Sequence, residues 1–228
     1  MSELVGIVGM SGSGKSTSIR NLDPKTTFII RVTKKPLPFA GYKKMYSEFS
    51  KDNPSGNYFQ SDNPMIISKT LDYINEKRPE IKTIIIDDFQ YTMGFEYMRR
   101  AREKGYEMFK EVGQNTFNLI NKAESLRDDI IVFVLTHPEI DTDALGNKMV
   151  KIKTLGKMID SYITLDGMFT TILYTNVEKT NNGIEYWFTT QTDGVNTAKS
   201  PIGMFDSYKI PNDLTLVIEA INKYQNQS

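Results

Sequence analysis

Short apolar runs alternate with helix-like segments along the first 140 residues of the chain. The runs occupy residues 4–8 (LVGIV), 27–32 (TFIIRV), 83–86 (TIII) and 129–135 (DIIVFVL). Runs of this length, rich in β-branched residues and bounded by polar ones, are typical of strands that a parallel sheet buries on both faces. Because parallel strands need crossover connections, the alternation predicts an α/β fold with a mostly parallel sheet flanked by helices.

Helical character marks four segments between and after these runs. They are residues 16–22, 64–78, 92–127 and about 212–224. The first ends at an Asp-Pro pair, which stops a helix. The second follows Asn63 and starts with a proline, which suits the cap and the first turn of a helix. We expect all four segments to be helices.

Two polar stretches interrupt the alternation. Residues 33–63 contain three prolines and are predicted to form an irregular insertion. Residues 139–147 follow the apolar run at 129–135 and are predicted to form a polar loop. A long irregular stretch inside a compact domain is often functional, so the first of these is of particular interest.

The last third of the chain has a different pattern. Apolar runs at residues 168–176 and 184–192 lie on either side of Asn182 and Gly183, a pair that favours a tight hairpin turn. This pattern predicts an antiparallel β extension toward the C-terminus that continues the parallel sheet. We expect one domain over residues 1–228.

Composition narrows the classes of function. The 28 Lys and Arg residues balance the 28 Asp and Glu residues, so any binding to nucleic acid would depend on a local patch. The absence of cysteine excludes disulfides, thiolate metal sites and a cysteine nucleophile. The N-terminal residues lack the basic segment and the long apolar run of a signal peptide, and no stretch of about 18 apolar residues is present that could span a membrane. We expect a cytoplasmic protein with no membrane partner.

Residues 9–17 (GMSGSGKST) are too rich in glycine for a helix and too polar for a buried strand. They match the phosphate-loop pattern, in which glycines let backbone N–H groups turn toward phosphates, a lysine reaches the β and γ phosphates, and a hydroxyl ligates Mg²⁺. The loop follows an apolar run and precedes a helical segment, as the pattern requires. We therefore predict ATP and Mg²⁺ as ligands. The predicted nucleotide contacts are Gly9, Met10, Ser11, Gly12, Ser13, Gly14, Lys15, Ser16 and Thr17.

Acidic residues at the end of a buried strand would complete such a site. Asp87 and Asp88 follow the run at residues 83–86. We predict that Asp87 holds Mg²⁺ together with Ser16, and that Asp88 polarises the attacking water. Aspartate is one methylene shorter than the glutamate that many ATPases place there, so the water would be bound differently or hydrolysis would be slow.

The single histidine lies at the end of another buried run. His137 and the preceding Thr136 follow residues 129–135, and the carboxyl ends of parallel strands meet at one edge of a sheet. His137 is therefore predicted to sense the γ phosphate, and it joins Lys15 and Asp88 as a predicted catalytic residue. The alternative is a local capping role.

These motifs together resemble the RecA-like P-loop NTPase core. The segments KPLPFAGYKK, KIKTLGKMID, LDGMFTTILY and QTDGVNTAKSPIGMF are similar to a family of small phage-encoded ATP-binding proteins. That family includes RecA-like single-strand annealing and recombination proteins, and the resemblance covers nearly the whole chain. It implies an ATPase that acts on single-stranded DNA in phage replication or recombination, in the cytoplasm of the host cell.

A RecA-like core binds single strands through loops that follow its strands, with lysines and arginines on the backbone and aromatic rings on the bases. The predicted DNA contacts are Arg99, Arg100, Arg102, Lys151 and Lys153. A further candidate set is Lys34, Lys35, Lys43 and Lys44 with Phe39 and Tyr42. The alternatives are a solvated basic face for each group and, for the last, a loop that packs Phe39 into the core.

The resemblance also implies self-association into a ring or filament. In RecA-like assemblies a basic residue of the neighbouring subunit completes the ATP site, and Lys199 is our candidate for that contact. Other phage replication or recombination proteins are further expected partners. Two other classes of function remain open, a nucleotide or small-molecule kinase and an ATP-gated loader that binds a protein partner.

Overall fold

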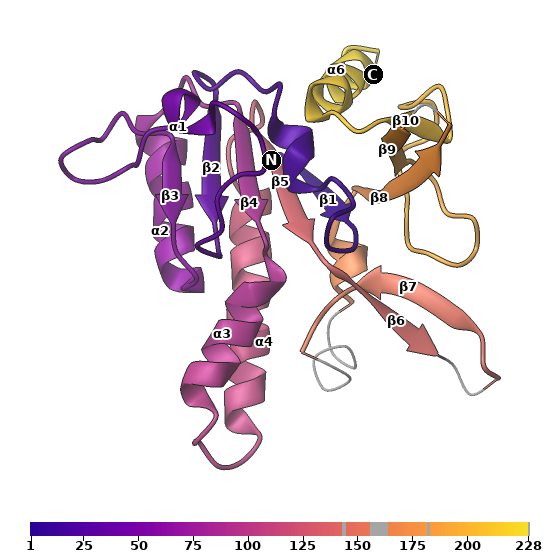
Figure 1. The fold of residues 1–228 in the computed structure, drawn as a ribbon. Helices are drawn as coiled ribbons and strands as arrows, with labels where there is room; N and C mark the ends of the chain where they lie inside the picture. The colour runs from indigo at the N-terminus through magenta and orange to yellow at the C-terminus, as the bar shows by residue number, and fades with distance from the viewer. Residues whose placement is uncertain (143–144, 156–163, 182, 228) are drawn as a thin grey trace.

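A single large sheet organises the molecule. The computed structural model describes residues 1–142, 145–155, 164–181 and 183–227 (Figure 1). Within that part of the chain the main sheet has eight strands in the order β10-β9-β8-β1-β5-β4-β2-β3. These strands are β1 (Glu3–Val8), β2 (Thr27–Arg31), β3 (Tyr58–Gln60), β4 (Thr83–Asp87), β5 (Ile131–Thr136), β8 (Thr171–Thr180), β9 (Gly183–Thr189) and β10 (Lys209–Pro211).

The predicted fold class is confirmed. All neighbouring strands from β8 to β3 run parallel, and β9 and β10 add antiparallel strands beyond β8. The result is a mostly parallel α/β sheet with an antiparallel extension from the C-terminal third of the chain. That residues 1–228 form a single domain stays a prediction.

Both faces of the parallel strands are buried, which explains their continuous apolar sequences. Val5 and Ile7 of β1 point into one core, and Leu4 and Val8 into the other. Helices α2 (Pro64–Lys77) and α4 (Glu107–Glu124) cover the face of Leu4 and Val8. The other face packs against η1 (Ser16–Ile19) and α6 (Leu214–Gln225). Successive side chains of a strand alternate in direction, so a strand between two helical layers has no polar side.

The helices predicted at residues 64–78 and 212–224 are confirmed as α2 and α6. The Asn63 side chain accepts hydrogen bonds from the N–H groups of Met65 and Ile66, and Pro64 occupies the first turn of α2. Asp213 caps α6 in the same way, by accepting from the N–H of Thr215. The sequence placed the start of α2 from its capping residue, whereas the Asp213 cap of α6 was not predicted.

The helix predicted over residues 16–22 is wrong. The chain makes one short 3₁₀ turn, η1, and then bends. The hydroxyl of Ser18 donates to the carbonyl of Lys15 over 2.5 Å, and the N–H of Leu22 bonds to the Ile19 carbonyl three residues back. Serine hydroxyls compete for the carbonyls that an α-helix needs, and a run of serine and threonine therefore favours the tighter turn.

The single helix predicted over residues 92–127 is two helices. They are α3 (Gln90–Arg100) and α4, and they form a hairpin that extends past the sheet (Figure 1). Gly105, in the turn, has φ +97, a left-handed conformation that ends a helix readily only at glycine.

Both polar stretches contain secondary structure that their sequences did not predict. Residues 33–63 include the short helix α1 (Tyr42–Met45) and the edge strand β3, which pairs with β2. The strands β6 (Pro138–Thr142) and β7 (Lys148–Ile152) pair in a separate antiparallel sheet, the β6–β7 hairpin. These strands are short and carry polar residues, so their extended conformation depends more on hydrogen bonds to a neighbouring strand than on a run of apolar residues.

The antiparallel extension is confirmed, although its turn cannot be described. Thr180 of β8 pairs with Gly183 of β9, as a tight hairpin requires, but Asn182 lies outside the described residues. The same holds for residues 156–160 of the KIKTLGKMID segment. Within the described chain, none of the helices combines the length and the apolar character needed to cross a membrane.

Candidate nucleotide site

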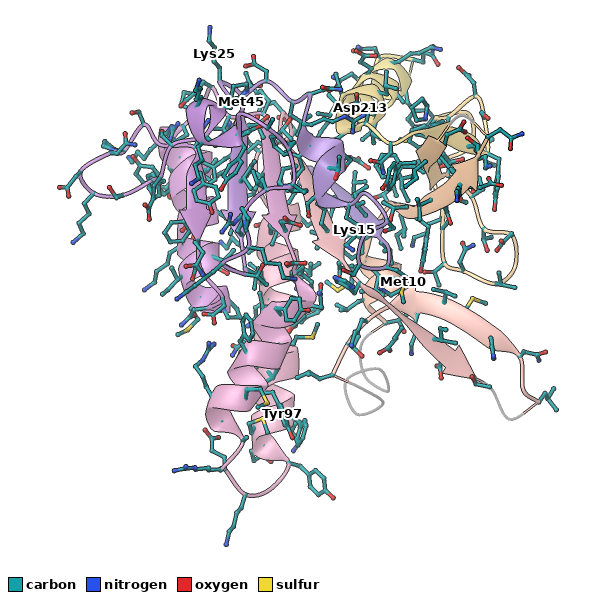
Figure 2. The ribbon with its side chains drawn as sticks, in the orientation of Figure 1. Met10, Lys15, Lys25, Met45, Tyr97 and Asp213 are labelled. Carbon is teal, nitrogen blue, oxygen red and sulfur yellow. The ribbon has the colours of Figure 1, made fainter. Side chains whose placement is uncertain are left out.

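The residues predicted for nucleotide chemistry come together at the carboxyl edge of the sheet. Strand β5 lies between β1 and β4, so the loop after β1, the acids after β4 and the histidine after β5 face one another across neighbouring strand ends. A cavity of about 230 Å³ is lined by Lys15, Ser16, Asp87, Asp88 and His137. Figure 2 shows Met10 and Lys15 on the loop that leads from β1 to η1.

The phosphate loop depends on its glycines. Gly12 and Gly14 have φ of +80 and +96, a region that side chains disfavour. At Gly9 a Cβ would overlap the Thr175 hydroxyl oxygen and lie 2.5 Å from that of Ser13. These two hydroxyls also form a short hydrogen bond with each other. The loop is therefore packed directly against β8, which the sequence motif does not reveal.

A Gly9→Ala substitution is expected to distort this packing. The added methyl group must push Thr175 or the loop aside, and overpacking of this kind destabilises by about 1–3 kcal/mol. Urea unfolding should show the loss, and ATP affinity should fall with it. Gly94→Ala is the control, because a Cβ there meets no atom within 4 Å and the backbone is helical. Equal effects of the two substitutions would contradict the packing argument.

Lys15 is folded back onto its own loop. Its ammonium group donates to the carbonyls of Gly9 at 2.7 Å and Met10 at 3.0 Å, and the residue is 6% exposed. Burial lowers the pKa of Lys15 to about 8, although the carboxylates of Asp88 and Asp87 oppose that shift. Phosphate oxygens would offer this ammonium stronger acceptors than two neutral carbonyls.

Ser16 and Asp87 form the oxygen pair that a magnesium ion would need. The Ser16 hydroxyl donates to Asp87 Oδ1 over 2.9 Å. Burial, and then the neighbouring Asp88, raise the pKa of Asp87 to about 6. Hydroxyl and carboxylate oxygens suit Mg²⁺, which usually takes few protein ligands and fills its octahedron with phosphate oxygens and water. In the described part of the chain no group of three or more acidic, histidine or cysteine side chains forms a site for a metal by itself.

Asp88 has a strained backbone and several partners. Its φ of 64° is the single positive value outside glycine among the described residues. Thr33 donates to its carboxylate over 2.7 Å, and His137 Nε2 and Lys35 Nζ lie 3.8 and 3.7 Å from it. Burial alone would raise the pKa of Asp88, but the nearby His137, the hydrogen bond from Thr33 and the charge of Lys35 lower it to about 2. Asp88 is therefore an ionised acceptor that turns into the cavity, and backbone strain at such a position is a feature of functional sites.

The sequence missed several residues that hold the site in place. Gln90 accepts hydrogen bonds from the Thr136 hydroxyl and the His137 N–H, both over 3.2 Å. Thr33 holds Asp88, and Asn212 lies against Gly14. Thr33 directly follows an apolar run and Gln90 lies three residues after β4, and those positions were the only available signal. Asn212 is brought to the loop by tertiary folding from the far end of the sequence.

The predicted DNA contacts lie outside this cavity. Arg99 pairs with Asp62 at 2.6 Å, and Arg100 pairs with Glu96, Glu103 and Glu111. Lys151 pairs with Glu139 and Asp141 across the β6–β7 hairpin. Arg102 and Lys153 are exposed. Acidic neighbours therefore neutralise three of the five predicted contacts. Phe39 of the remaining candidate set is partly buried against the core, as the structural alternative proposed.

Lys199 lies in a segment that pairs with β8. Its backbone exchanges hydrogen bonds with Ile172 over 3.0 and 2.8 Å, and its side chain is half-buried. Burial lowers the pKa of Lys199, although Asp166 opposes the shift. Whether it reaches the ATP site of a second subunit stays a prediction.

Two solved structures are distantly similar to this chain. The genome packaging NTPase B204 from Sulfolobus turreted icosahedral virus 2, solved with ATP-gammaS, is 16% identical with a TM-score of 0.40, and the match covers 80% of this chain and 78% of that one. The flagellar accessory protein FlaH from Methanocaldococcus jannaschii is 14% identical with a TM-score of 0.44, covering 91% and 83%. Likenesses this distant do not indicate what the chain acts on.

No curated protein matches the sequence. The family model described as an AAA domain matches residues 3–202, which include the phosphate loop, both aspartates and His137. Because that match spans most of the chain, the protein belongs to the AAA domain family and is an ATP-binding P-loop NTPase.

Proposed function

We propose that the protein is a Mg²⁺-dependent ATPase that acts on single-stranded DNA during phage replication or recombination, in the host cytoplasm. The observation that carries the ATPase part is the convergence of Lys15, Ser16, Asp87, Asp88 and His137 on one cavity. Lys15 would bind the β and γ phosphates. Mg²⁺, when bound by Ser16 and Asp87, would neutralise phosphate charge.

The other groups have distinct roles in this proposal. Asp88 is ionised and would accept a hydrogen bond from the attacking water, orienting it toward the γ phosphate. His137 lies 3.8 Å from Asp88 and would contact the γ phosphate. Release of that phosphate would therefore remove a contact at the end of β5. The β6–β7 hairpin starts one residue later, so it is a natural element to respond.

Two elements that project beyond the site support the DNA part. The α3–α4 hairpin and the β6–β7 hairpin both extend past the edge of the sheet at which the cavity lies (Figure 1), and Tyr97 marks the projecting part of α3 in Figure 2. Their exposed basic residues include Arg102, Lys104, Lys148 and Lys153. Such side chains suit the phosphates of a strand that passes in front of the ATP site.

Self-association and protein partners are part of the same proposal. Lys199 would contact the ATP site of a neighbouring subunit in a ring or filament. Large apolar side chains are available for such contacts, since Ile140 and Ile202 are 65% and 96% exposed. Other replication or recombination proteins of the phage would use the same kind of surface.

Single-stranded DNA is expected to raise the rate of ATP hydrolysis about fivefold or more, the effect of a coupling of about 1 kcal/mol. Phosphate release with and without a poly-dT oligonucleotide measures it, and the stimulation should weaken steeply with salt because phosphate contacts release counterions. Double-stranded DNA of the same length is the control. A phosphorylated small-molecule product would favour a kinase, and no response to DNA would favour a partner-driven switch.

A further inference from the structure

A second cavity lies beside the nucleotide site. It has a volume of about 370 Å³ and lies between the end of β2, the edge strand β3 and the segment that leads to α1. Pro36 lines both this cavity and the nucleotide cavity, so the segment after β2 separates them. Figure 1 shows that this segment returns from the carboxyl end of β2 to α1 at the opposite end of the sheet. We call it the Arg31 cavity.

The cavity contains a buried arginine that has no hydrogen bond to an anion. Arg31 is 7% exposed, its guanidinium carbon lies 4.8 Å from the centre of the Tyr58 ring, and its buried Nε has no hydrogen-bond partner. Asp87 lies beside it on β4, and the charge of Arg31 opposes the rise in the pKa of Asp87. Asp87 is hydrogen-bonded to Ser16, however, and among the described residues no carboxylate forms a hydrogen bond or an ion pair with Arg31. A buried charge that lacks a partner is destabilising, so the arrangement calls for a ligand.

Another buried arginine shows what a structural role looks like in this protein. Arg78 is 8% exposed, as buried as Arg31. It pairs with Glu80 at 2.5 Å and donates to the carbonyls of Pro54, Ser55 and Gly56 over 2.8 to 3.1 Å. Every part of the Arg78 guanidinium has an acceptor. Arg31 has an aromatic ring on one side and a cavity beside it.

A second buried donor in the same cavity lacks a partner. Tyr46 is 5% exposed, and its hydroxyl forms no hydrogen bond. Burial, and then the charge of Asp23, raise the pKa of Tyr46 to about 12, so the hydroxyl keeps its proton and can donate. Buried hydroxyl groups in native proteins are almost always paired. Arg31 and Tyr46 both line this cavity, and each has a buried donor without a partner, so the two residues point independently to an anionic acceptor.

The rest of the lining fits a nucleotide. Lys34 and Lys43 add two exposed ammonium groups, against the single carboxylate of Glu48. The rings of Tyr42 and Tyr58 also line the cavity. Arginine and lysine bind phosphate, and tyrosine rings stack on bases regardless of sequence. The volume lies at the lower end of the about 300–1,000 Å³ of small-ligand sites, which suits a single nucleotide unit.

We infer that the Arg31 cavity binds one nucleotide unit, whose phosphate accepts hydrogen bonds from Arg31 and Tyr46 and whose base lies against Tyr42 or Tyr58. The unit comes either from a DNA single strand or from a free nucleotide, which share this chemistry. Only the first source rests on the proposed function. Because Arg31 neighbours Asp87 in the sheet, the ligand would lie one strand away from the ATP site.

Stability measurements separate a ligand-binding arginine from a structural one. Arg31→Met keeps much of the side-chain volume and removes the unpaired charge, so the melting temperature without ligand should stay level or rise. The matched control is Arg78→Met, which leaves buried carbonyls unpaired and should lower the melting temperature clearly.

Binding decides the inference. The probes are fluorescein-labelled dT12, followed by anisotropy, and dTMP, titrated by calorimetry into Lys15→Ala protein so that the phosphate loop contributes little. Arg31→Met should weaken binding of at least one probe about tenfold or more, the effect of one charged hydrogen bond to phosphate. Tyr46→Phe should weaken it less, and Arg78→Met should leave it unchanged. Tyr46→Phe keeps the ring and removes only the hydroxyl, so this variant still tests the inference if Arg31→Met fails to fold.

Each outcome has a meaning. Loss of dT12 binding identifies a DNA strand as the source, whereas loss of dTMP binding alone identifies a free nucleotide and leaves the cavity assignment intact even if DNA fails to stimulate ATP hydrolysis. If both probes bind the Arg31 and Tyr46 variants as they bind the parent protein, the inference is overturned. DNA-stimulated hydrolysis could then persist, and the proposed function would stand without this site.

Discussion

Lys15→Ala is expected to lower the rate of ATP hydrolysis about 100-fold or more, because one preorganised charge aimed at the reacting phosphate contributes that much to a transition state. The side chain already points along its loop, where it is held by the carbonyls of Gly9 and Met10. Phosphate release at saturating ATP measures the rate, and a fluorescent nucleotide measures the affinity, which should also fall.

The control for Lys15 is a lysine far from the cavity. Lys25 is exposed, and Figure 2 shows it at the top of the view, well away from Lys15 near the centre. Lys25→Ala should leave hydrolysis and ATP affinity unchanged. Normal hydrolysis by Lys15→Ala would overturn the assignment of the phosphate loop.

Asp88→Asn is expected to lower kcat about 100-fold while ATP affinity changes little, because the carboxylate acts on the water and not on the bound nucleotide. Asparagine has almost the same shape and tolerates positive φ, so the backbone conformation at φ 64° is kept and only the charge is lost. Steady-state kinetics over a range of ATP concentrations separates kcat from KM.

Asp87→Asn provides the comparison for Asp88. Asp87 is hydrogen-bonded to Ser16, so its loss should raise the Mg²⁺ concentration needed for half-maximal hydrolysis. A shift in the Mg²⁺ requirement for Asp88→Asn, with none for Asp87→Asn, would mean that the two roles are exchanged. Asp88→Ala is a poorer test, because alanine disfavours positive φ and adds strain to the loss of charge.

Elements with strong local signals were predicted well. The apolar runs became β1, β2, β4 and β5, Asn63 and Pro64 marked the start of α2, and the helical pattern near the C-terminus became α6. Elements with weak local signals were not predicted. The strands β3, β6, β7 and β10 are short, and their residues take extended conformations because a neighbouring strand offers hydrogen bonds.

The candidate site shows the same division. The motif at residues 9–17 and the aspartates after β4 identify a phosphate and metal chemistry from residue types alone, since each type has one obvious role there. The structure added Thr33, Gln90 and Thr175, which are 55, 46 and 162 positions from the partners they contact. Positioning contacts of that span leave no pattern in a single sequence.

The basic residues illustrate why charge runs predict partners poorly. Arg99, Arg100 and Lys151 look equivalent to Arg102 and Lys153 in the sequence, but the fold gives the first three carboxylate neighbours. In contrast, Arg31 lies inside an apolar run, where the sequence indicates no binding role, and the fold leaves it buried beside a cavity.

The sequence by itself therefore determined the α/β class, the order of the main strands along the chain, the phosphate loop and the acids that face it. These follow from contiguous residues, because strand burial, helix capping and phosphate binding each act over a few positions. Only the tertiary structure decided the strand order in space, the anchoring of Asp88 by Thr33 and the unpaired state of Arg31. Each of these depends on which distant segments pack together, and local sequence preferences do not determine that packing.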